Sequence, residues 1–396
     1  MTMRLNLPAS DGTLQPYTLR GTPGIAPARP GTQFNRIAYS AAHVVADARA
    51  NVDPWLACAI DWDTTIAYRQ RLWGMGLGVA EAMDTAQRGM GLDWPTSLEL
   101  IRRSLDAARD VPGALVASGC GTDQLAPDAA KSVDDVIRAY EEQMAAIEKL
   151  GGRLIVMASR ALARVAKSPA DYERVYSRVL SQAKQPVVLH WLGEMFDPAL
   201  AGYWGNGNVD AAMDTALGII AAHSSKVDGI KISLLDKDKE IAMRRRLPAG
   251  VRMYTGDDFN YAELIAGDGV GEATTHKQSD ALLGIFDAIA PAASAALGAL
   301  AAGDTARFNA ILEPTVPLSR HIFKAPTRFY KTGVVFMAWL NGHQPHFVMV
   351  GGQQSTRSLP HFAELFRLAD AAGLIEDPER AARRMRTLLA LHGVDA

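Results

Sequence analysis

A lysine inside an apolar segment is the residue of this chain whose surroundings most favour chemistry. Lys231 lies in residues 228–235 (DGIKISLL), a short apolar run typical of a buried strand. Burial lowers the pKa of a lysine because it disfavours the charged ammonium. A neutral amine can attack a carbonyl carbon and form a Schiff base. The alternative is a buried ion pair with a carboxylate at a strand end, and the strand alone does not choose between them.

Polar residues also follow the other short apolar runs, where strands are expected to end. Among these residues, His190 has a side chain suited to general acid and base catalysis near neutral pH. Several others are carboxylates, which accept hydrogen bonds from sugar hydroxyls. The complete set is Asp84, Thr85, residues 119–123, Ser159, Arg160, His190, Glu194, Lys231, Ser233, Asp257, Asp258 and residues 274–276.

The elements that must position these residues alternate along the first 280 residues of the chain. Eight apolar runs predict strands at 36–45, 77–84, 114–119, 153–159, 186–191, 229–233, 251–256 and 270–275. Amphipathic stretches predict helices between them, at 96–110, 133–150, 170–184, 209–223, 236–246 and 260–266, with one more around Tyr68. Such alternation is typical of a parallel sheet, and eight units match a (β/α)8 TIM barrel. A doubly wound open sheet is the structural alternative.

The pattern changes after residue 278 to helices only, predicted at 280–301, 305–323, 328–340, 359–372 and 378–392. The sequence therefore predicts an α/β fold, a (β/α)8 barrel with a C-terminal helical extension. We expect three parts: an N-terminal extension at 1–34, the barrel at 35–278 and a helical region at 279–396 packed on the barrel. In a barrel the polar ends of the strands gather at one face, which is where an active site is expected.

Composition excludes several classes of protein. With 41 Lys and Arg against 43 Asp and Glu, the net charge is -2, so no basic surface is expected for nucleic acid. The longest uncharged stretch, 288–303, contains Pro291 and is shorter than the roughly 20 residues of a membrane helix. The distant cysteines Cys58 and Cys120 and the lack of a readable secretory signal favour a cytoplasmic protein.

Two motifs resemble the dihydrodipicolinate synthase and N-acetylneuraminate lyase family. Residues 228–233 (DGIKIS) precede residues 253–258 (MYTGDD) by about twenty positions. Residues 119–124 (GCGTDQ), 186–191 (PVVLHW) and 323–342 resemble further family segments in the same order, so the resemblance covers roughly residues 35–375. The resemblance implies a TIM barrel, a Schiff-base role for Lys231 and a homodimer or homotetramer.

The sequence departs from that family at several positions. His190 occupies the place of a proton-shuttling tyrosine at the end of the fifth strand. The loop that holds the carboxylate of a 2-oxo acid is replaced by residues 83–87 (MDTAQ), where only Thr85 remains and Asp84 would repel a carboxylate. The arginine after the fifth strand is absent, with residues 193–195 (GEM) in its region, and residues 158–161 (ASRA) lack the tyrosine pair of the fourth strand.

These observations favour a Schiff-base lyase or aldolase, or a dehydratase, that acts on a small carbonyl compound. We expect a keto sugar or a related polyhydroxylated substrate rather than pyruvate, and no cofactor, because the protonated imine itself withdraws electrons. The expected catalytic residues are Lys231, His190 and Thr85. The expected substrate-binding residues are Asp84, Gly121, Thr122, Glu194, Ser233, Asp257 and Asp258.

Two other functions remain open. The acidic residues with His190 and His276 are of types that bind divalent cations, so a metal-dependent sugar isomerase, epimerase or lyase is one alternative. The chain has no close-spaced ligand motif for such a metal. The other alternative is a catalytically silent carbohydrate-binding barrel. A buried lysine that is neither used nor paired would be costly to keep in such a protein.

Overall fold

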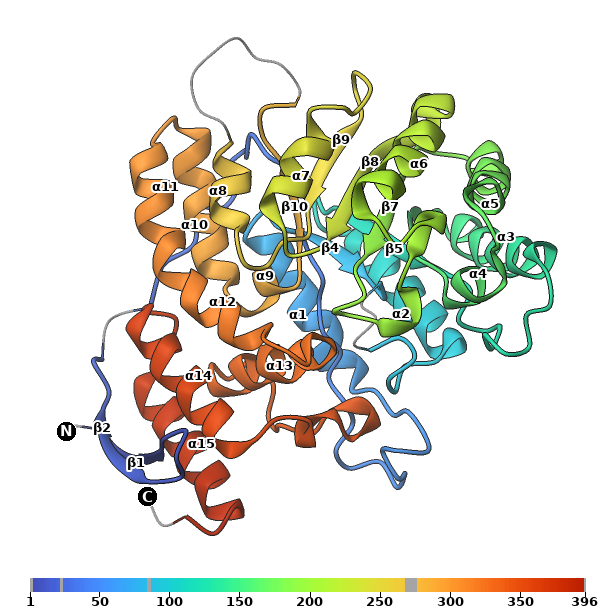
Figure 1. Ribbon diagram of the computed structural model, residues 1–396. Coiled ribbons are helices and arrows are strands. Elements are labelled where there is room, and N and C mark those ends of the chain that lie inside the picture. Colours follow the sequence, from blue (N-terminus) through green and yellow to red (C-terminus); the bar gives the residue numbers. More distant parts are fainter. Residues whose placement is uncertain (1–2, 22–23, 84–86, 268–275, 395–396) are drawn as a thin grey trace.

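Eight parallel strands form a closed barrel at the centre of the computed structural model (Figure 1). The structure describes residues 3–21, 24–83, 87–267 and 276–394. The strands follow one another around the barrel in chain order, and the last, β10, pairs with the first, β3. Their bounds are β3 Ala38–Ser40, β4 Gly78–Glu81, β5 Val116–Cys120, β6 Arg153–Val156, β7 Val187–Leu192, β8 Val227–Ser233, β9 Arg252–Thr255 and β10 Asp280–Leu283. The predicted barrel is confirmed.

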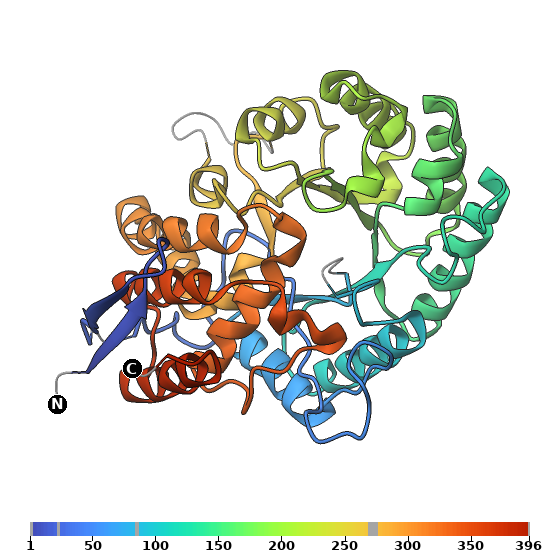
Figure 2. The ribbon, with the colours of Figure 1, turned by 60° about the horizontal axis from the view of Figure 1, so that its bottom comes forward.

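Helices surround the barrel, and Figure 2 shows much of this ring. Most of them begin at an Asp, Asn or Ser whose side chain accepts a hydrogen bond from the first turn, which supplies a partner for an otherwise unpaired backbone N–H. Ser132 and Asp135 at the start of α3 form a reciprocal capping box. The helices are α1 Trp62–Gly74, α2 Trp94–Ala108, α3 Val133–Lys149, α4 Arg160–Val165, α5 Pro169–Gln182, α6 Val209–Ala222, α7 Lys237–Arg244 and α8 Tyr261–Ala266.

The eighth strand differs from the sequence prediction. Residues 270–275, predicted as this strand, lie outside the described residues. The strand that closes the barrel is Asp280–Leu283, which the sequence assigned to a helix at 280–301. The segment from Ala281 to Ala302 is almost uniformly apolar, and periodicity cannot separate a four-residue strand from a buried helix in such a run. The barrel therefore extends beyond the predicted boundary at 278.

The C-terminal helices gather on one side of the barrel, in the orange and red part of Figure 2. They are α9 Ile285–Ala288, α10 Ala290–Ala301, α11 Thr305–Leu312, α12 Val316–Ile322, α13 Tyr330–Leu340, α14 Leu359–Ala371 and α15 Pro378–Leu391. The helix predicted at 305–323 is divided by a 3-10 turn at Glu313–Thr315. Pro314 and Pro317 lie at this break, and proline removes a backbone donor from a helix. The predicted helical extension is confirmed.

The N-terminal segment forms a two-stranded antiparallel hairpin of β1 Arg4–Pro8 and β2 Leu14–Thr18. The hairpin lies beside the C-terminal helices in both ribbon views. The Tyr17 hydroxyl donates a hydrogen bond of 2.6 Å to Asp370 on α14, and the backbone N–H of Arg20 donates to the same carboxylate oxygen at 2.9 Å. The hairpin and the residues that follow it are thus attached to the C-terminal helices.

A buried polar cluster joins the C-terminal helices to the barrel. Asp287 on α9 accepts hydrogen bonds from the backbone N–H of His43 at 2.8 Å and pairs with His43 Nδ1 at 2.9 Å. Lys331 on α13 lies 3.7 Å from Asp287 and donates to the carbonyl of Ala41 at 2.7 Å. All three charged or polar side chains are almost completely buried. The segment after β3 is therefore held by groups from two C-terminal helices.

Two apolar clusters divide the core. The larger one fills the layer between the strands and the helices. The smaller one lies inside the barrel and contains alternate residues of the strands: Tyr39, Ala41, Ala80, Met83, Ala117, Ile155, Met157, Val188, Tyr254 and Leu282. Because side chains alternate along a strand, this inner set identifies which neighbouring positions face the barrel interior.

None of the helices, over the ranges that the structure describes, combines the length and the hydropathy needed to cross a bilayer.

Candidate active site

Lys231 faces the interior of the barrel. A Cβ atom on Gly229, two residues earlier in β8, would lie 2.7 Å from the ring of Tyr254, which belongs to the inner cluster. Alternation along the strand therefore turns Lys231 and Ser233 inward as well. Only 6% of the surface of Lys231 is exposed. The amine predicted to form a Schiff base is thus buried inside the barrel, near the carboxyl end of its strand.

His190 is the neighbour of Lys231 on the adjacent strand. The two residues are partners in the register of β7 and β8, and His190 follows the inward-facing Val188 by two positions. Its Nε2 lies 3.3 Å from Oγ of Ser233, whereas its buried Nδ1 has no hydrogen-bond partner within the described ranges of the chain. Burial, together with the positive charge of Lys231, lowers the pKa of His190 well below its ordinary value. The imidazole is therefore neutral at pH 7.

Asp257 and Asp258 follow β9, and the structure gives them different surroundings. Both oxygens of Asp257 are used within its own turn: Oδ1 accepts from the N–H groups of Phe259 and Asn260, and Oδ2 accepts from the Asn260 amide. Asp258 accepts one hydrogen bond of 2.8 Å, from the N–H of Ile285. Burial raises the pKa of Asp258 to about 7, and the opposing charge of Lys231 limits the rise. Asp258 is thus near enough to Lys231 for the charge of the lysine to act on its carboxyl.

Gly121 and Thr122 follow β5 and are already engaged with neighbouring groups. The N–H of Gly121 donates to Oε1 of Gln143 at 2.7 Å. The Thr122 hydroxyl lies 2.6 Å from the hydroxyl of Ser159, which itself accepts from the N–H of Leu162 at 3.0 Å. These contacts connect the end of β5 to the start of α4. Both predicted residues line a pocket at the ends of β5 and β6.

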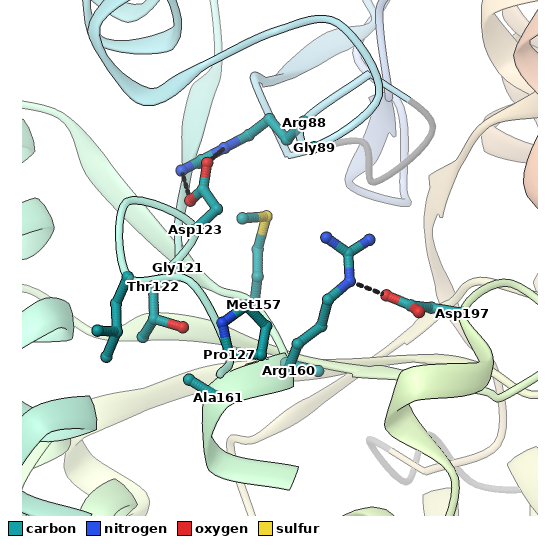
Figure 3. Close-up of a pocket in the computed structure, with 12 residues that line it drawn as sticks. Arg88, Gly89, Gly121, Thr122, Asp123, Pro127, Met157, Arg160, Ala161 and Asp197 are labelled. Atoms are coloured by element: carbon teal, nitrogen blue, oxygen red, sulfur yellow. Dashed lines mark hydrogen bonds and ion pairs between the residues drawn. The ribbon is translucent and has the colours of Figure 1, made fainter. Parts of the chain in front are cut away.

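This pocket has a volume of about 100 Å³ and is lined by two arginines and two aspartates (Figure 3). Arg88 pairs with Asp123, and Nε of Arg160 donates to Asp197 at 2.5 Å. Met157, another lining residue, also belongs to the inner cluster of the barrel. The pocket therefore borders the barrel interior in which Lys231 lies.

The remaining predicted residues do not join this group. Glu194 is exposed and lines a different pocket, together with Leu234 and Asp236. Asp84 and Thr85 lie outside the described residues. Within the described part of the chain, no three His, Cys, Asp or Glu side chains form a group that could hold a metal ion. The structure thus gathers Lys231, His190, Ser233 and Asp258, and places Gly121 and Thr122 at the adjoining pocket.

Sequence reasoning did not select the two ion pairs of the pocket. Arg160 and Asp123 stand at predicted strand ends, so position alone marks them as candidates. Arg88 and Asp197 lie deeper in the loops that follow β4 and β7. The partners are 35 and 37 residues apart in the chain. Only closure of the barrel brings these loops together.

A family described as "Protein of unknown function (DUF993)" matches residues 5–394. No curated protein sequence matches this chain significantly. Solved structures do resemble it, and the fold expected from the resemblance to the dihydrodipicolinate synthase family is confirmed by them.

Three structures of that family serve as examples. Dihydrodipicolinate synthase from Aquifex aeolicus is 12% identical, with a TM-score of 0.59 over 91% of this chain and 98% of that chain. YagE, a prophage protein of the same family from E. coli K12 in complex with pyruvate, is 14% identical, with a TM-score of 0.62 over 91% and 100%. The chloride-inhibited synthase from Acinetobacter baumannii complexed with pyruvate is 13% identical, with a TM-score of 0.61 over 86% and 99%. At these identities the likeness concerns the fold.

Proposed function

The chain belongs to the DUF993 family, and we propose that it is a Schiff-base-forming lyase or aldolase, or a dehydratase, that acts on a keto sugar or a related polyhydroxylated carbonyl compound. One observation carries the proposal: Lys231 is buried inside the barrel, in register with the neutral imidazole of His190. The barrel provides a water-poor interior in which an imine can persist, and the adjacent imidazole can move the protons that imine chemistry requires.

The first step forms a bond between Nζ of Lys231 and the carbonyl carbon of the substrate. The ammonium must first lose a proton, and Asp258, with a pKa raised by burial to about 7, is suited to accept it near neutral pH. The carbonyl oxygen then gains protons and leaves as water, which gives the imine. His190 is neutral and can donate to or accept from the substrate during these steps.

The protonated imine then withdraws the electrons of a neighbouring bond. If that bond is C–C, the hydroxyl on the departing carbon gives its proton to a base such as His190 while the C–C electron pair moves toward the imine carbon. This aldol cleavage leaves an enamine on Lys231 and releases a carbonyl product. If a C–H proton is removed first and a hydroxide equivalent leaves from the next carbon, the reaction is a dehydration. Both outcomes need the same lysine and the same proton-transfer group, and neither needs an organic cofactor.

The polar groups of the site support a polyhydroxylated substrate. The hydroxyl of Ser233 and the carboxyl of Asp258 lie in the barrel interior or at its mouth, beside the lysine. Thr122 lines the adjoining pocket. Hydroxyl and carboxyl groups pair readily with the hydroxyls of a sugar. The segment MDTAQ at 83–87, in place of a carboxylate-binding loop, supports a substrate other than pyruvate.

The test is intact-mass spectrometry after borohydride reduction in the presence of keto sugars and 2-oxo acids. We expect the wild type to gain the mass of a reduced keto sugar adduct, and Lys231→Ala to gain none while its thermal melt stays cooperative. Lys149→Ala, a change at an exposed helix residue, serves as the matched lysine control and should retain the adduct. An adduct that persists in Lys231→Ala would remove the mechanism. A wild type that forms no adduct but is purified with stoichiometric divalent metal would favour the metal-dependent alternative.

A further inference from the structure

The pocket beside the barrel interior (Figure 3) contains carboxylates that are already satisfied. Asp123 accepts from Nε and Nη2 of Arg88 and from the amide of Gln143. Asp197 accepts from Nε of Arg160 through one oxygen and from the N–H of Ala199 through the other. Each of the four carboxylate oxygens therefore holds a donor from the protein. These carboxylates do not require a cationic ligand.

Arg88 is satisfied in the same way. Besides its contacts with Asp123, its Nη1 donates to the carbonyls of Ala82 and Gly119, at 3.1 and 2.6 Å. Its Nη2 also donates to Oε1 of Gln143 at 2.9 Å. A guanidinium has five N–H donors, and these contacts occupy all of them. Arg88 therefore holds the loop after β4 against the end of β5.

Arg160 differs from Arg88 because its terminal nitrogens are not engaged. Nε donates to Asp197, and in the described part of the structure no hydrogen bond of either Nη atom is found. Its side chain is one-third exposed, and Figure 3 shows it reaching from the start of α4 toward the segment of Arg88 and Gly89. Within the described structure, the four N–H groups on the Nη atoms of Arg160 are therefore available to a ligand. The two aspartates of the pocket, in contrast, already accept hydrogen bonds from the protein.

Gly89 provides the room for this guanidinium. A Cβ atom at position 89 would lie 2.7 Å from Nη1 of Arg160, and the residue has a φ of +81°. Glycine adopts this conformation without the steric cost that other residues meet. Because Gly89 has no side chain and adopts a positive φ, the guanidinium of Arg160 can lie against the loop at the position where it pairs with Asp197.

We propose that Arg160 binds an anionic end group of the substrate, a carboxylate or a phosphate, and so selects keto sugar acids or keto sugar phosphates over neutral keto sugars. A guanidinium oriented through Nε can present its Nη groups to two oxygens of one anion. Met157 lines the pocket and also belongs to the cluster inside the barrel. The proposed anion site therefore adjoins the barrel interior that contains Lys231. The inference rests on the proposed function and narrows its substrate class.

The experiment compares three ketones that differ in their end group: fructose, fructose 6-phosphate and 5-ketogluconate. The concentration that gives half-maximal borohydride-trapped adduct is measured by intact mass. In the wild type we expect at least one anionic compound to need a concentration about 10- to 100-fold lower than fructose, the range for a hydrogen-bonded charge pair. The anionic compound with the lower half-maximal concentration identifies the preferred end group as phosphate or carboxylate.

The variants assign that preference to Arg160. Arg160→Gln should bring the half-maximal concentration of the preferred anion close to that of fructose, and Arg160→Lys should restore only part of the difference because it lacks the planar fork. Arg164→Gln, one turn later on α4 and exposed, should keep the wild-type preference. An equal preference in Arg160→Gln, or no preference in the wild type, would overturn the inference.

A second measurement separates this inference from the proposed function. The thermal midpoint of each variant is recorded with and without fructose 6-phosphate and 5-ketogluconate, with no borohydride present. Anion-dependent stabilisation that disappears in Arg160→Gln but not in Arg164→Gln supports the anion site even if no adduct forms, in which case the imine chemistry fails alone. If adducts form but show no preference for an anionic ketone, and no anionic ketone raises the thermal midpoint, the imine chemistry is supported and the anion site is refuted. If no adduct forms and no ketone stabilises the protein, both the imine chemistry and the anion site are refuted.

Discussion

Gly256 lies directly against the side chain of Lys231. A Cβ atom at position 256 would be 2.7 Å from Cε of Lys231 and 2.4 Å from Oγ of Ser233. Gly256 follows β9, the strand next to the one that carries the lysine. The lysine can thus extend through the barrel interior because its neighbour has no side chain. Gly256 is therefore part of the site, because a side chain at this position would occupy the space of the Lys231 and Ser233 side chains.

Gly256→Ala is the first prediction. The added methyl group must displace Lys231, Ser233 or the carbonyl of Ile232, which would lie 2.5 Å away. Such overpacking costs about 1–3 kcal/mol of stability. We expect the rate of adduct formation at Lys231 to fall by at least tenfold, as measured by borohydride trapping over time at saturating ketone.

The control for this change is Gly218→Ala. Gly218 lies within α6, and a Cβ atom there would meet no other group of the described residues within 4 Å. Alanine at such a helix position should stabilise the protein by roughly 0.5–1 kcal/mol and leave the trapping rate unchanged. A wild-type trapping rate in Gly256→Ala would show that the position of the lysine does not depend on this glycine.

His190→Phe is the second prediction. The change keeps a ring of similar shape and removes both nitrogens, of which Nε2 lies 3.3 Å from Ser233. If His190 transfers protons, kcat for the ketone identified by trapping should fall by about 10² to 10⁴. The measurement is steady-state turnover of that ketone. Ser233→Ala retains the imidazole and should cost much less. A change in KM with kcat unchanged would assign His190 to binding.

Much of the barrel, and the inward position of Lys231 and His190, could be predicted because both depend on the local pattern of apolar and polar residues. Lys231 interrupts an apolar run, and a polar residue in a strand of a parallel sheet is costly unless it is used or paired. His190 ends an equally apolar run. Both residues remain within strands in the structure, so alternation alone turns them toward the interior. The sequence contains the information that places them there.

Other features depend on chain closure, and local pattern does not report them. The strand Asp280–Leu283 differs from its helical surroundings only by its partners, Ala38–Ser40 and Tyr254–Thr255. Glu194 stands two residues beyond the end of β7, where strand alternation no longer fixes the side chain, and it is exposed. Arg160 stood at a strand end, but its significance depends on Asp197 and Gly89, which belong to other loops.

A third prediction concerns pH and Glu240. The side chain is buried on α7, and its Oε1 accepts from the Ser279 hydroxyl at 2.7 Å, whereas no hydrogen-bond partner of Oε2 is found among the residues that the structure describes. Burial raises the pKa of Glu240 to about 8 from an ordinary value of 4.5. Between these values the folded state keeps the proton and the unfolded chain loses it. Glu240 therefore lowers the free energy of unfolding as the pH rises, by up to about 1.4 kcal/mol per unit.

Glu240→Gln removes this dependence. The variant should gain stability relative to the wild type as the pH increases from 5 to 8, with a change in the difference of at least about 1 kcal/mol. Urea unfolding at the two pH values measures it. Glu173→Gln changes an exposed residue of α5. Its free energy of unfolding should differ from that of the wild type by the same amount at pH 5 and pH 8. A constant difference for Glu240→Gln would mean that Glu240 loses its proton equally in both states.

The last prediction concerns Asp287, which lies between His43 and Lys331 at the junction of the barrel and the C-terminal helices. Burial alone would raise the pKa of Asp287, but the interactions with His43, which include a hydrogen bond, and the nearby Lys331 outweigh it, so the pKa lies below its ordinary value. The carboxylate therefore stabilises the fold above about pH 4, and this contribution is lost as the pH falls below the unfolded-state value.

Asp287→Asn should lower the free energy of unfolding at pH 7 by about 3–5 kcal/mol, because it removes a buried carboxylate that interacts with both His43 and Lys331. Urea unfolding measures this loss, and Asp110→Asn at an exposed position should change it by less than about 0.5 kcal/mol. The double variant Asp287→Asn/Lys331→Met should cost less than the sum of the single changes, since each removes the same pair. Additive losses would show that Asp287 acts on the fold through His43 and the backbone after β3 rather than through Lys331.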